Sequence, residues 1–175
     1  MREQLKFLYE GGRVQRFHCQ ALVKPQNVAE HSFYVAALVA LMYGDCEGQA
    51  LRGLRILAAA LWHDLAEHKI GDVQSPAKRA SKELKNILDT MEAASLKTVG
   101  LWTNLDAVEK RMLKMADNLD VLATCLRERT LGNLTLEEVY ENNKSYIEKL
   151  EPVGKELEVF HLITSQWEEL NGSQR

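Results

Sequence analysis

The chain has 175 residues and a formal net charge of −3, and 46% of its residues are hydrophobic. This length and apolar share allow one folded domain with a sizeable core, which we assign to the whole chain, residues 1–175. The slight negative charge argues against a binder of nucleic acid polymers, whose surface would be basic. It still allows a free nucleotide as ligand, which needs only a few local cations.

The cysteines are odd in number and lack C-x-x-C spacing: Cys19, Cys46 and Cys125. We expect reduced thiols in a cytoplasmic protein, without a disulfide framework or a thiolate metal site. Residues 1–10 mix charged and apolar types, which argues against a secretory signal, and the longest apolar run, residues 56–62, is too short to cross a bilayer. No membrane association is therefore expected.

Apolar residues recur at helical spacing along most of the chain, and no window alternates convincingly with the period of two that is typical of a strand. In chain order, the expected helices are 3–10, 28–43, 51–66, 82–99, 106–129, 135–150 and 152–170. Irregular backbone is expected at 13–27 and, because of Gly71 and Pro76, at 69–77. The sequence predicts an all-α fold of six or seven helices. The segment 51–66 should be the central buried helix, because it is apolar on most sides.

Several helix ends carry local signals. Residues 11 and 12, both glycine, are expected to end the first helix. Residues 106–109 (Asp-Ala-Val-Glu) have the form of a capping box, and residues 135–138 (Thr-Leu-Glu-Glu) repeat it. Pro152 suits the first turn of the last helix.

Two histidines and two aspartates lie inside these helical patterns: His31, the adjacent pair His63-Asp64, and Asp117. If folding brings them together, they make a mixed nitrogen and oxygen site for one divalent cation. Asp117 lies among apolar neighbours, where an Asp is a poor helix former and costly to bury unpaired. Adjacent helical residues point about 100° apart, so His63 and Asp64 should flank an ion rather than face each other. A lone histidine is more often structural, so the hypothesis depends on all four.

Six short stretches carry a family resemblance: 15–17 (QRF), 28–32 (VAEHS), 63–67 (HDLAE), 71–72 (GD), 75–78 (SPAK) and 114–117 (KMAD). Together with the order H, HD, D, they resemble the HD-domain phosphohydrolase superfamily over roughly residues 13–129. Within it, the chain is similar to bacterial 5'-deoxynucleotidases and to short phage deoxynucleoside triphosphate triphosphohydrolases. It looks most like the phage dATP triphosphohydrolases that accompany 2-aminoadenine genomes.

The resemblance implies a role for ten residues. The metal ligands would be His31, His63, Asp64 and Asp117. Glu67 would orient or deprotonate the attacking water, unless it is a surface residue or supports a ligand histidine. Asp72 would lie near the sugar or leaving group, although it could simply cap its loop. Phosphate oxygens would be bound by Arg16, Lys78 and Lys114. The base or sugar would be contacted by Phe17, which could equally be a core residue.

The predicted reaction is metal-dependent hydrolysis of dATP to deoxyadenosine and triphosphate. The presence of Lys78 and Lys114 in addition to Arg16 favours a triphosphate substrate, because a monophosphate needs fewer cations. Imidazole ligands favour Zn or Co, and the carboxylates tolerate Mn or Mg. The alternatives are a 5'-deoxynucleotidase with a monophosphate substrate, a nucleotide-binding module without turnover, and a helical interaction domain without a site. The resemblance also implies a homo-oligomer, from dimer to hexamer, in the cytoplasm, which would be the host's if the chain is phage-encoded.

Overall fold

The structure, a computed structural model, describes residues 1–44, 50–73 and 75–172. Over these ranges the regular structure is helical, with one isolated β-bridge between Gln15 and Asn27. The helices are α1 (Arg2–Gly12), α2 (Val28–Tyr43), α3 (Ala50–Trp62), α4 (Glu67–Ile70), α5 (Ser75–Ala80), α6 (Lys82–Thr98), α7 (Ala107–Thr130), α8 (Glu137–Lys149) and α9 (Lys155–Gly172). The predicted all-α class is confirmed. The irregular backbone expected at 69–77 is confirmed at residues 71–73, whereas α4 and α5 occupy the two ends of that segment.

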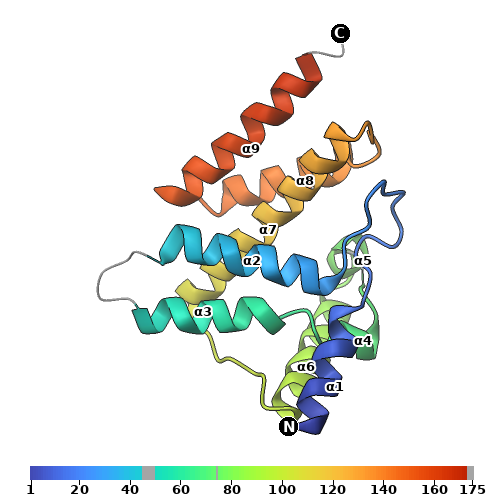
Figure 1. Ribbon diagram of the computed structural model, residues 1–175, viewed down its shortest axis with the longest axis vertical. Coiled ribbons are helices and arrows are strands. Elements are labelled where there is room, and N and C mark those ends of the chain that lie inside the picture. The colour runs from blue at the N-terminus through green and yellow to red at the C-terminus, as the bar shows by residue number, and fades with distance from the viewer. Residues whose placement is uncertain (45–49, 74, 173–175) are drawn as a thin grey trace.

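Helix α7 is the central element. It crosses behind α2 and α3 and contacts both of them, as well as α8 and α9 (Figure 1). The remaining helices α1, α4, α5 and α6 gather at one end of the α2–α3 pair (Figure 1). None of the described helices is both long and apolar enough to traverse a membrane.

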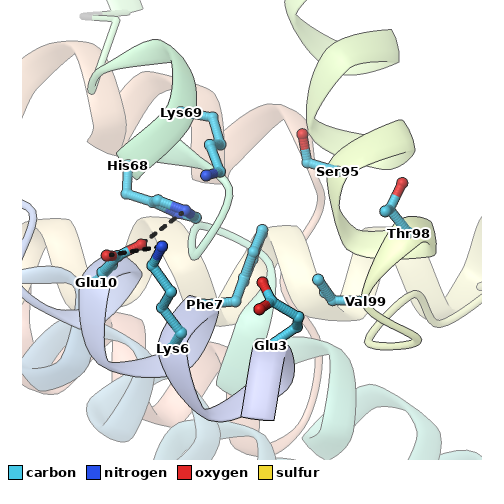
Figure 2. A pocket seen from close by; sticks show the side chains of 9 residues that line it. All are labelled: Glu3, Lys6, Phe7, Glu10, His68, Lys69, Ser95, Thr98 and Val99. Carbon is cyan, nitrogen blue, oxygen red and sulfur yellow. Dashed lines mark ion pairs between the residues drawn. The ribbon is translucent and has the colours of Figure 1, made fainter. Parts of the chain in front are cut away.

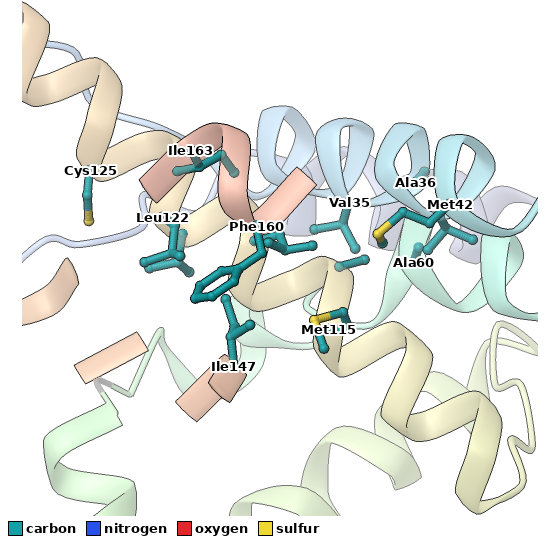
Figure 3. Packing of buried hydrophobic residues seen from close by; sticks show 14 of the residues in the cluster. Val35, Ala36, Met42, Ala60, Met115, Leu122, Cys125, Ile147, Phe160 and Ile163 are labelled. Atoms are coloured by element: carbon teal, nitrogen blue, oxygen red, sulfur yellow. The ribbon is translucent and has the colours of Figure 1, made fainter. Parts of the chain in front are cut away.

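The main core lies between α7 and the helices around it. Met115, Leu119 and Leu122 of α7 are fully buried, and Figure 3 shows Met115 and Leu122 among side chains of α2, α8 and α9. Each such side chain contributes about 1.5–3 kcal/mol when it is removed from water. The core therefore holds α7 firmly, and α7 can serve as a rigid support for polar residues at its edge.

The predicted capping boxes had different outcomes. Asp106 and Glu109 form the reciprocal pair of bonds at the start of α7, as expected. Thr135 does not cap α8, which follows Leu136 without a side-chain cap. The Thr135 hydroxyl bonds instead with Asn133 Oδ1 and the Ala21 carbonyl oxygen, at 2.7 and 3.3 Å. One acceptor lies in the same loop as Thr135 and the other in the segment 13–27, so the hydroxyl does not bond to the first turn of α8.

The two glycines predicted to end the first helix are the last two residues of α1. A Cβ placed on Gly11 would stand 2.5 Å from the backbone oxygen of Leu65, and one on Gly12 would stand 3.2 Å from the Cβ of Ala29. Glycine at these positions therefore lets α1 approach the segment after His63-Asp64 and the first turn of α2. The predicted end of the first helix at the two glycines is confirmed to within two residues, and the structure adds a role in close packing.

Candidate metal centre and active site

The chain changes conformation at the His63-Asp64 pair. Helix α3 ends at Trp62, and residues 63–66 form tighter turns, in which the Leu65 amide donates to the Trp62 oxygen and the Glu67 amide to the Asp64 oxygen. The expected helix 51–66 is therefore four residues too long. Because of this break, His63 Nε2 lies 3.3 Å from Asp64 Oδ1, so the two side chains do face each other.

The Nε2 atoms of His31 and His63 face each other. His31 is fully buried, and its Nδ1 bonds with Asp120 Oδ2 at 2.7 Å. His63 Nδ1 bonds with the Ala60 carbonyl oxygen at 3.0 Å. Both partners can only accept, so each Nδ1 carries the proton and each Nε2 is left to bind something else. The two Nε2 atoms lie 3.3 Å apart.

Two carboxylates complete the cluster. Asp117 Oδ1 lies 3.3 Å and Asp64 Oδ2 lies 3.5 Å from His31 Nε2. Ligand atoms of His31, His63 and Asp117 all fall within 4.8 Å of one another. Asp64 contacts both imidazoles, because its Oδ1 also lies 3.3 Å from His63 Nε2. Two imidazole nitrogens and two carboxylates are a donor set that fits a divalent metal ion. The structure thus brings together all four residues that were predicted as ligands.

The electrostatics of the cluster favour positive charge. Burial acts to raise the pKa of Asp64, but His63 and Arg16 outweigh it and bring that pKa to about 2. Burial likewise opposes ionisation of Asp117, yet Lys114 and His31 hold its pKa well below the usual range. Burial lowers the pKa of His31, and its carboxylate partners more than compensate, so the net shift is upward. In the absence of a metal ion, a proton on His31 Nε2 would supply positive charge next to the two carboxylates.

Asp120 was not among the residues predicted for the site. It is buried on α7, and its Oδ2 accepts from both His31 Nδ1 and Gln26 Nε2, the latter at 3.1 Å. A carboxylate on the remote nitrogen of a ligand histidine fixes the ring orientation and makes the ring a better donor to a metal. The available signal was its position three residues after Asp117, which places both on one face of α7.

Arg16 lies in the irregular segment 13–27 and donates a hydrogen bond through its Nη1 to Asp64 Oδ2. This segment is anchored by Glu128, a buried residue near the end of α7. The Glu128 carboxylate accepts from the backbone amides of Val23 and Lys24 at 2.7 and 2.9 Å. The anchor holds the guanidinium at the edge of the cluster.

Glu67 is the first residue of α4 and is buried. Its Oε2 has no hydrogen-bond partner among the described residues. Burial, together with the nearby charges of Asp64 and Asp72, raises the pKa of Glu67 to about 9. In the metal-free chain this carboxyl therefore keeps its proton at neutral pH. The positive charge of a metal ion in the cluster would favour its ionised form, which can accept a proton from a water molecule.

The other predicted polar residues surround this centre with partners of their own. Asp72 lies 3.6 Å from His18 Nδ1. Lys78 on α5 pairs with Glu92 of α6 at 3.7 Å. Lys114 pairs with Asp117 Oδ2 at 2.7 Å, one turn before it on α7.

Phe17 does not line an open wall. It is 9% exposed and belongs to the main core, with a positive φ of 54°. The Arg16 guanidinium lies 5.8 Å from the centre of its ring. The structure therefore favours the core role for Phe17 and places only Arg16 at the cluster.

A cavity of about 330 Å³ opens beside the cluster, between α3, α6 and α7. Its lining includes His63, Asp117 and Lys114, together with Trp62 and Trp102. A slightly larger cavity, about 380 Å³, lies between α1, α4 and α6 (Figure 2). It is lined by residues of both charges, including Lys6 and Glu10, and by none of the four cluster residues. Only the first cavity connects to the candidate site.

The helical fold and the H, HD, D cluster define an HD-type phosphohydrolase. A profile of the family described as 5'-deoxynucleotidase YfbR-like matches residues 5–105, more than half of the chain. The chain belongs to this YfbR-like family of HD-domain phosphohydrolases.

Individual relatives agree with this membership. A 5'-deoxynucleotidase of Vibrio parahaemolyticus is 28% identical over 138 residues, which cover 69% of this chain and 71% of that protein. The PH0347 protein of Pyrococcus horikoshii matches in fold with a TM-score of 0.75 at 23% identity, over 95% of this chain and 99% of that one. The HD phosphohydrolase DatZ of cyanophage S-2L, solved with dA and one catalytic Zn²⁺ ion, matches with a TM-score of 0.66 at 21% identity over 94% of each chain.

Proposed function

We propose that this protein is a metal-dependent 5'-deoxynucleotidase, which hydrolyses deoxynucleoside 5'-monophosphates to deoxynucleosides and phosphate. The observation that carries the proposal is the cluster of His31, His63 and Asp117, with Asp64 in contact with both imidazoles, in a chain of the YfbR-like family that also buries the carboxyl of Glu67.

His31, His63, Asp64 and Asp117 would hold the metal ion, with Zn or Co favoured by the imidazoles and Mn or Mg tolerated by the carboxylates. Such an ion polarises a phosphate oxygen and makes a water molecule more acidic. Asp120 keeps His31 in the required orientation through the 2.7 Å bond to Nδ1.

Glu67 is the proposed base. Its free oxygen accepts a proton from the water, the water oxygen forms a bond to phosphorus, and the bond between phosphorus and the sugar O5' breaks. The departing oxygen takes up a proton from solvent water as the deoxynucleoside leaves, and Glu67 later returns its proton to solvent. Arg16 exchanges Asp64 for phosphate oxygens, which a guanidinium binds with two parallel bonds. Asp72 is proposed to lie near the sugar or leaving group.

The pairing of the lysines supports a monophosphate substrate. Lys78 is neutralised by Glu92 and Lys114 by Asp117, so neither provides unbalanced positive charge for a long phosphate chain. The triphosphate reaction, dATP to deoxyadenosine and triphosphate, is the second candidate. It is supported by Lys114, which lines the cavity beside Asp117 and could release that carboxylate to a metal ion.

Product analysis separates the two candidates. The metal-free chain is incubated with dAMP, dATP and AMP, each with Zn²⁺, Co²⁺, Mn²⁺ or Mg²⁺, and the products are resolved by ion-exchange chromatography. We expect phosphate from dAMP, with dATP turned over more slowly. Triphosphate from dATP at the higher kcat/KM would select the second candidate. No product from any substrate, with bound metal and an intact helical spectrum, would overturn both.

The proposed substrate class and the free thiols also bear on where the protein acts. We propose that the chain is one domain that acts in the cytoplasm on free nucleotides rather than on nucleic acid polymers. Cys19 and Cys125 are both unpaired, which suits a reducing compartment. The predicted free thiol of Cys46 lies outside the described residues.

A further inference from the structure

Helix α6 brings two carboxylates to the cavity beside the metal centre. Asp89 and Glu92 are three residues apart on α6, and both line that cavity. Asp89 has a partner on its own helix, because the Lys85 ammonium group donates a hydrogen bond to it. No lysine or arginine lies three or four residues from Glu92 in the sequence, so its charge has to be balanced from another element.

The cation that balances Glu92 is Lys78 on the short helix α5, whose Nζ lies 3.7 Å from Glu92 Oε1. At this distance the two groups attract each other by charge, without a well-formed hydrogen bond. The side chains of Lys78 and Glu92 are only 27% and 22% exposed, so salt screens this pair less than it screens an ion pair on the open surface. Removal of the Glu92 charge would therefore leave Lys78 as an unbalanced cation.

The pair of Lys78 and Glu92 lies within electrostatic reach of the metal centre. Burial raises the pKa of Glu92, Lys78 opposes this shift, and the charge of Asp64 adds to it. Burial is also the main cause of the raised pKa of Glu67, and Lys78 opposes that shift as well. Charge effects of this kind decline with distance, so Lys78 acts on the α6 carboxylate and on the proposed base at the same time. A change at Glu92 therefore alters the charge that a substrate meets at the metal centre.

The cavity has the size and the lining to hold phosphates beyond the first. Its volume of about 330 Å³ lies in the usual range of ligand pockets, about 300–1,000 Å³. His63 and Asp117 line it, so a phosphate bound at the metal centre would stand at its edge. Lys110 and Lys114 line it as well, and ammonium groups suit phosphate oxygens better than they suit an uncharged deoxynucleoside. Space thus allows a longer phosphate chain, and the balance of charge decides whether it binds.

We propose that Glu92 is a specificity-determining residue that limits the substrate to one phosphate, an inference that rests on the proposed function. Its carboxylate neutralises Lys78 and repels the phosphates that a triphosphate would extend into the cavity. The single phosphate of a deoxynucleoside monophosphate would stay at the metal centre, where Arg16 balances its charge. Glu92 thus selects against longer substrates rather than for the monophosphate itself.

The test removes the charge of Glu92 and keeps its shape. In Glu92→Gln, the ratio of kcat/KM for dATP to kcat/KM for dAMP should rise by about 10- to 100-fold, the effect of one charge about 6–10 Å away near a protein surface. Glu83→Gln is the matched control, because Glu83 is exposed on the same helix and does not line the cavity. It should leave the ratio unchanged. Adding Lys78→Gln to Glu92→Gln removes both charges of the pair and should return the ratio to the wild-type value.

A binding measurement tests the same residue without turnover. The metal-free chain is titrated with inorganic triphosphate and with orthophosphate, and binding is followed by tryptophan fluorescence, because Trp62 and Trp102 line the cavity. Glu92→Gln should bind triphosphate about 10- to 100-fold more tightly than the wild type does, with little change for orthophosphate. Glu83→Gln should bind both anions as the wild type does.

Four results would overturn the role of Glu92. These are a wild type that prefers dATP, equal changes for dATP and dAMP in Glu92→Gln, a gain for dATP that survives Lys78→Gln, and unchanged triphosphate binding in Glu92→Gln. Equal changes for the two substrates would place the nucleoside, rather than further phosphates, in the cavity. A wild type that hydrolyses neither substrate would overturn the proposed function instead, and the triphosphate titration would still decide the role of Glu92.

Discussion

The bond between His31 and Asp120 makes a quantitative prediction about metal affinity. His31 Nδ1 lies 2.7 Å from Asp120 Oδ2, with both residues buried. Asp120→Asn keeps an acceptor of the same shape but loses the charge, whereas Asp120→Ala removes the acceptor altogether. In both variants the Nε2 atom of His31 becomes a weaker ligand for a metal ion. In Asp120→Ala the imidazole ring is also free to rotate.

Loss of such a supporting partner typically weakens metal binding by about 10- to 100-fold. We place Asp120→Asn near the lower limit and Asp120→Ala near the upper one, which corresponds to about 1.4 and 2.7 kcal/mol. Gln26 donates to the same oxygen at 3.1 Å. The alanine variant therefore leaves the buried side-chain amide of Gln26 without its partner as well, and its free energy of unfolding should fall by about 1–3 kcal/mol.

Zinc affinity of the metal-free chain is measured by competition with a chromophoric chelator. Glu156→Gln is the control, because Glu156 is also a buried carboxylate and accepts hydrogen bonds from Tyr43 and Arg111, outside the cluster. It should leave zinc affinity unchanged. Equal affinity in the wild type and both Asp120 variants would refute the supporting role of Asp120. Equal losses in the Glu156 variant would show that the effect is general destabilisation.

Three further predictions concern Glu67 and Gly11. Glu67→Gln should lower kcat by about 100- to 10,000-fold because it removes the proposed base, while zinc titration shows that the metal still binds; unchanged turnover would exclude Glu67 as the base. In the metal-free chain, the pKa of Glu67 is raised from 4.5 to about 9, chiefly by burial, so the native state retains a proton that the unfolded chain releases. The free energy of unfolding should therefore fall as pH rises between these values, and Glu67→Gln should flatten the fall in urea titrations; parallel pH profiles would contradict this. Gly11→Ala should destabilise the fold by about 1–3 kcal/mol, because its Cβ would meet the Leu65 oxygen. Gly172→Ala, with no atom within 4 Å, should be neutral or stabilising in the same thermal melts, and a stabilising Gly11→Ala would mean that α1 does not press on the segment after His63-Asp64.

Periodicity and local capping were sufficient to predict the long helices. The range 28–43 was predicted with the bounds that α2 has, because apolar residues at helical spacing begin after Asn27 and stop at Gly44. The start of α7 was predicted from Asp106 and Glu109, whose mutual bonds depend only on residues three apart.

The features that were missed depend on contacts between distant segments. The break after Trp62 occurs where α1 packs on Leu65 through Gly11, and no local pattern around residue 63 reports that contact. Asp120 was overlooked because a mid-helix aspartate is usually exposed, and its partner His31 is 89 residues away. The four candidate metal ligands were predicted from a family resemblance. Asp120, which supports His31, was found only from the distance between the two side chains in the structure.

The anchoring of segment 13–27 by Glu128 separates two properties that are often equated, irregular backbone and mobile backbone. The amides of Val23 and Lys24 donate to a carboxylate that is 0% exposed, so both should exchange with deuterium far more slowly than loop amides usually do. Arg16, carried by the same segment, would then meet a phosphate already in place. Little conformational entropy would be lost when it binds, and this favours affinity without any additional contact.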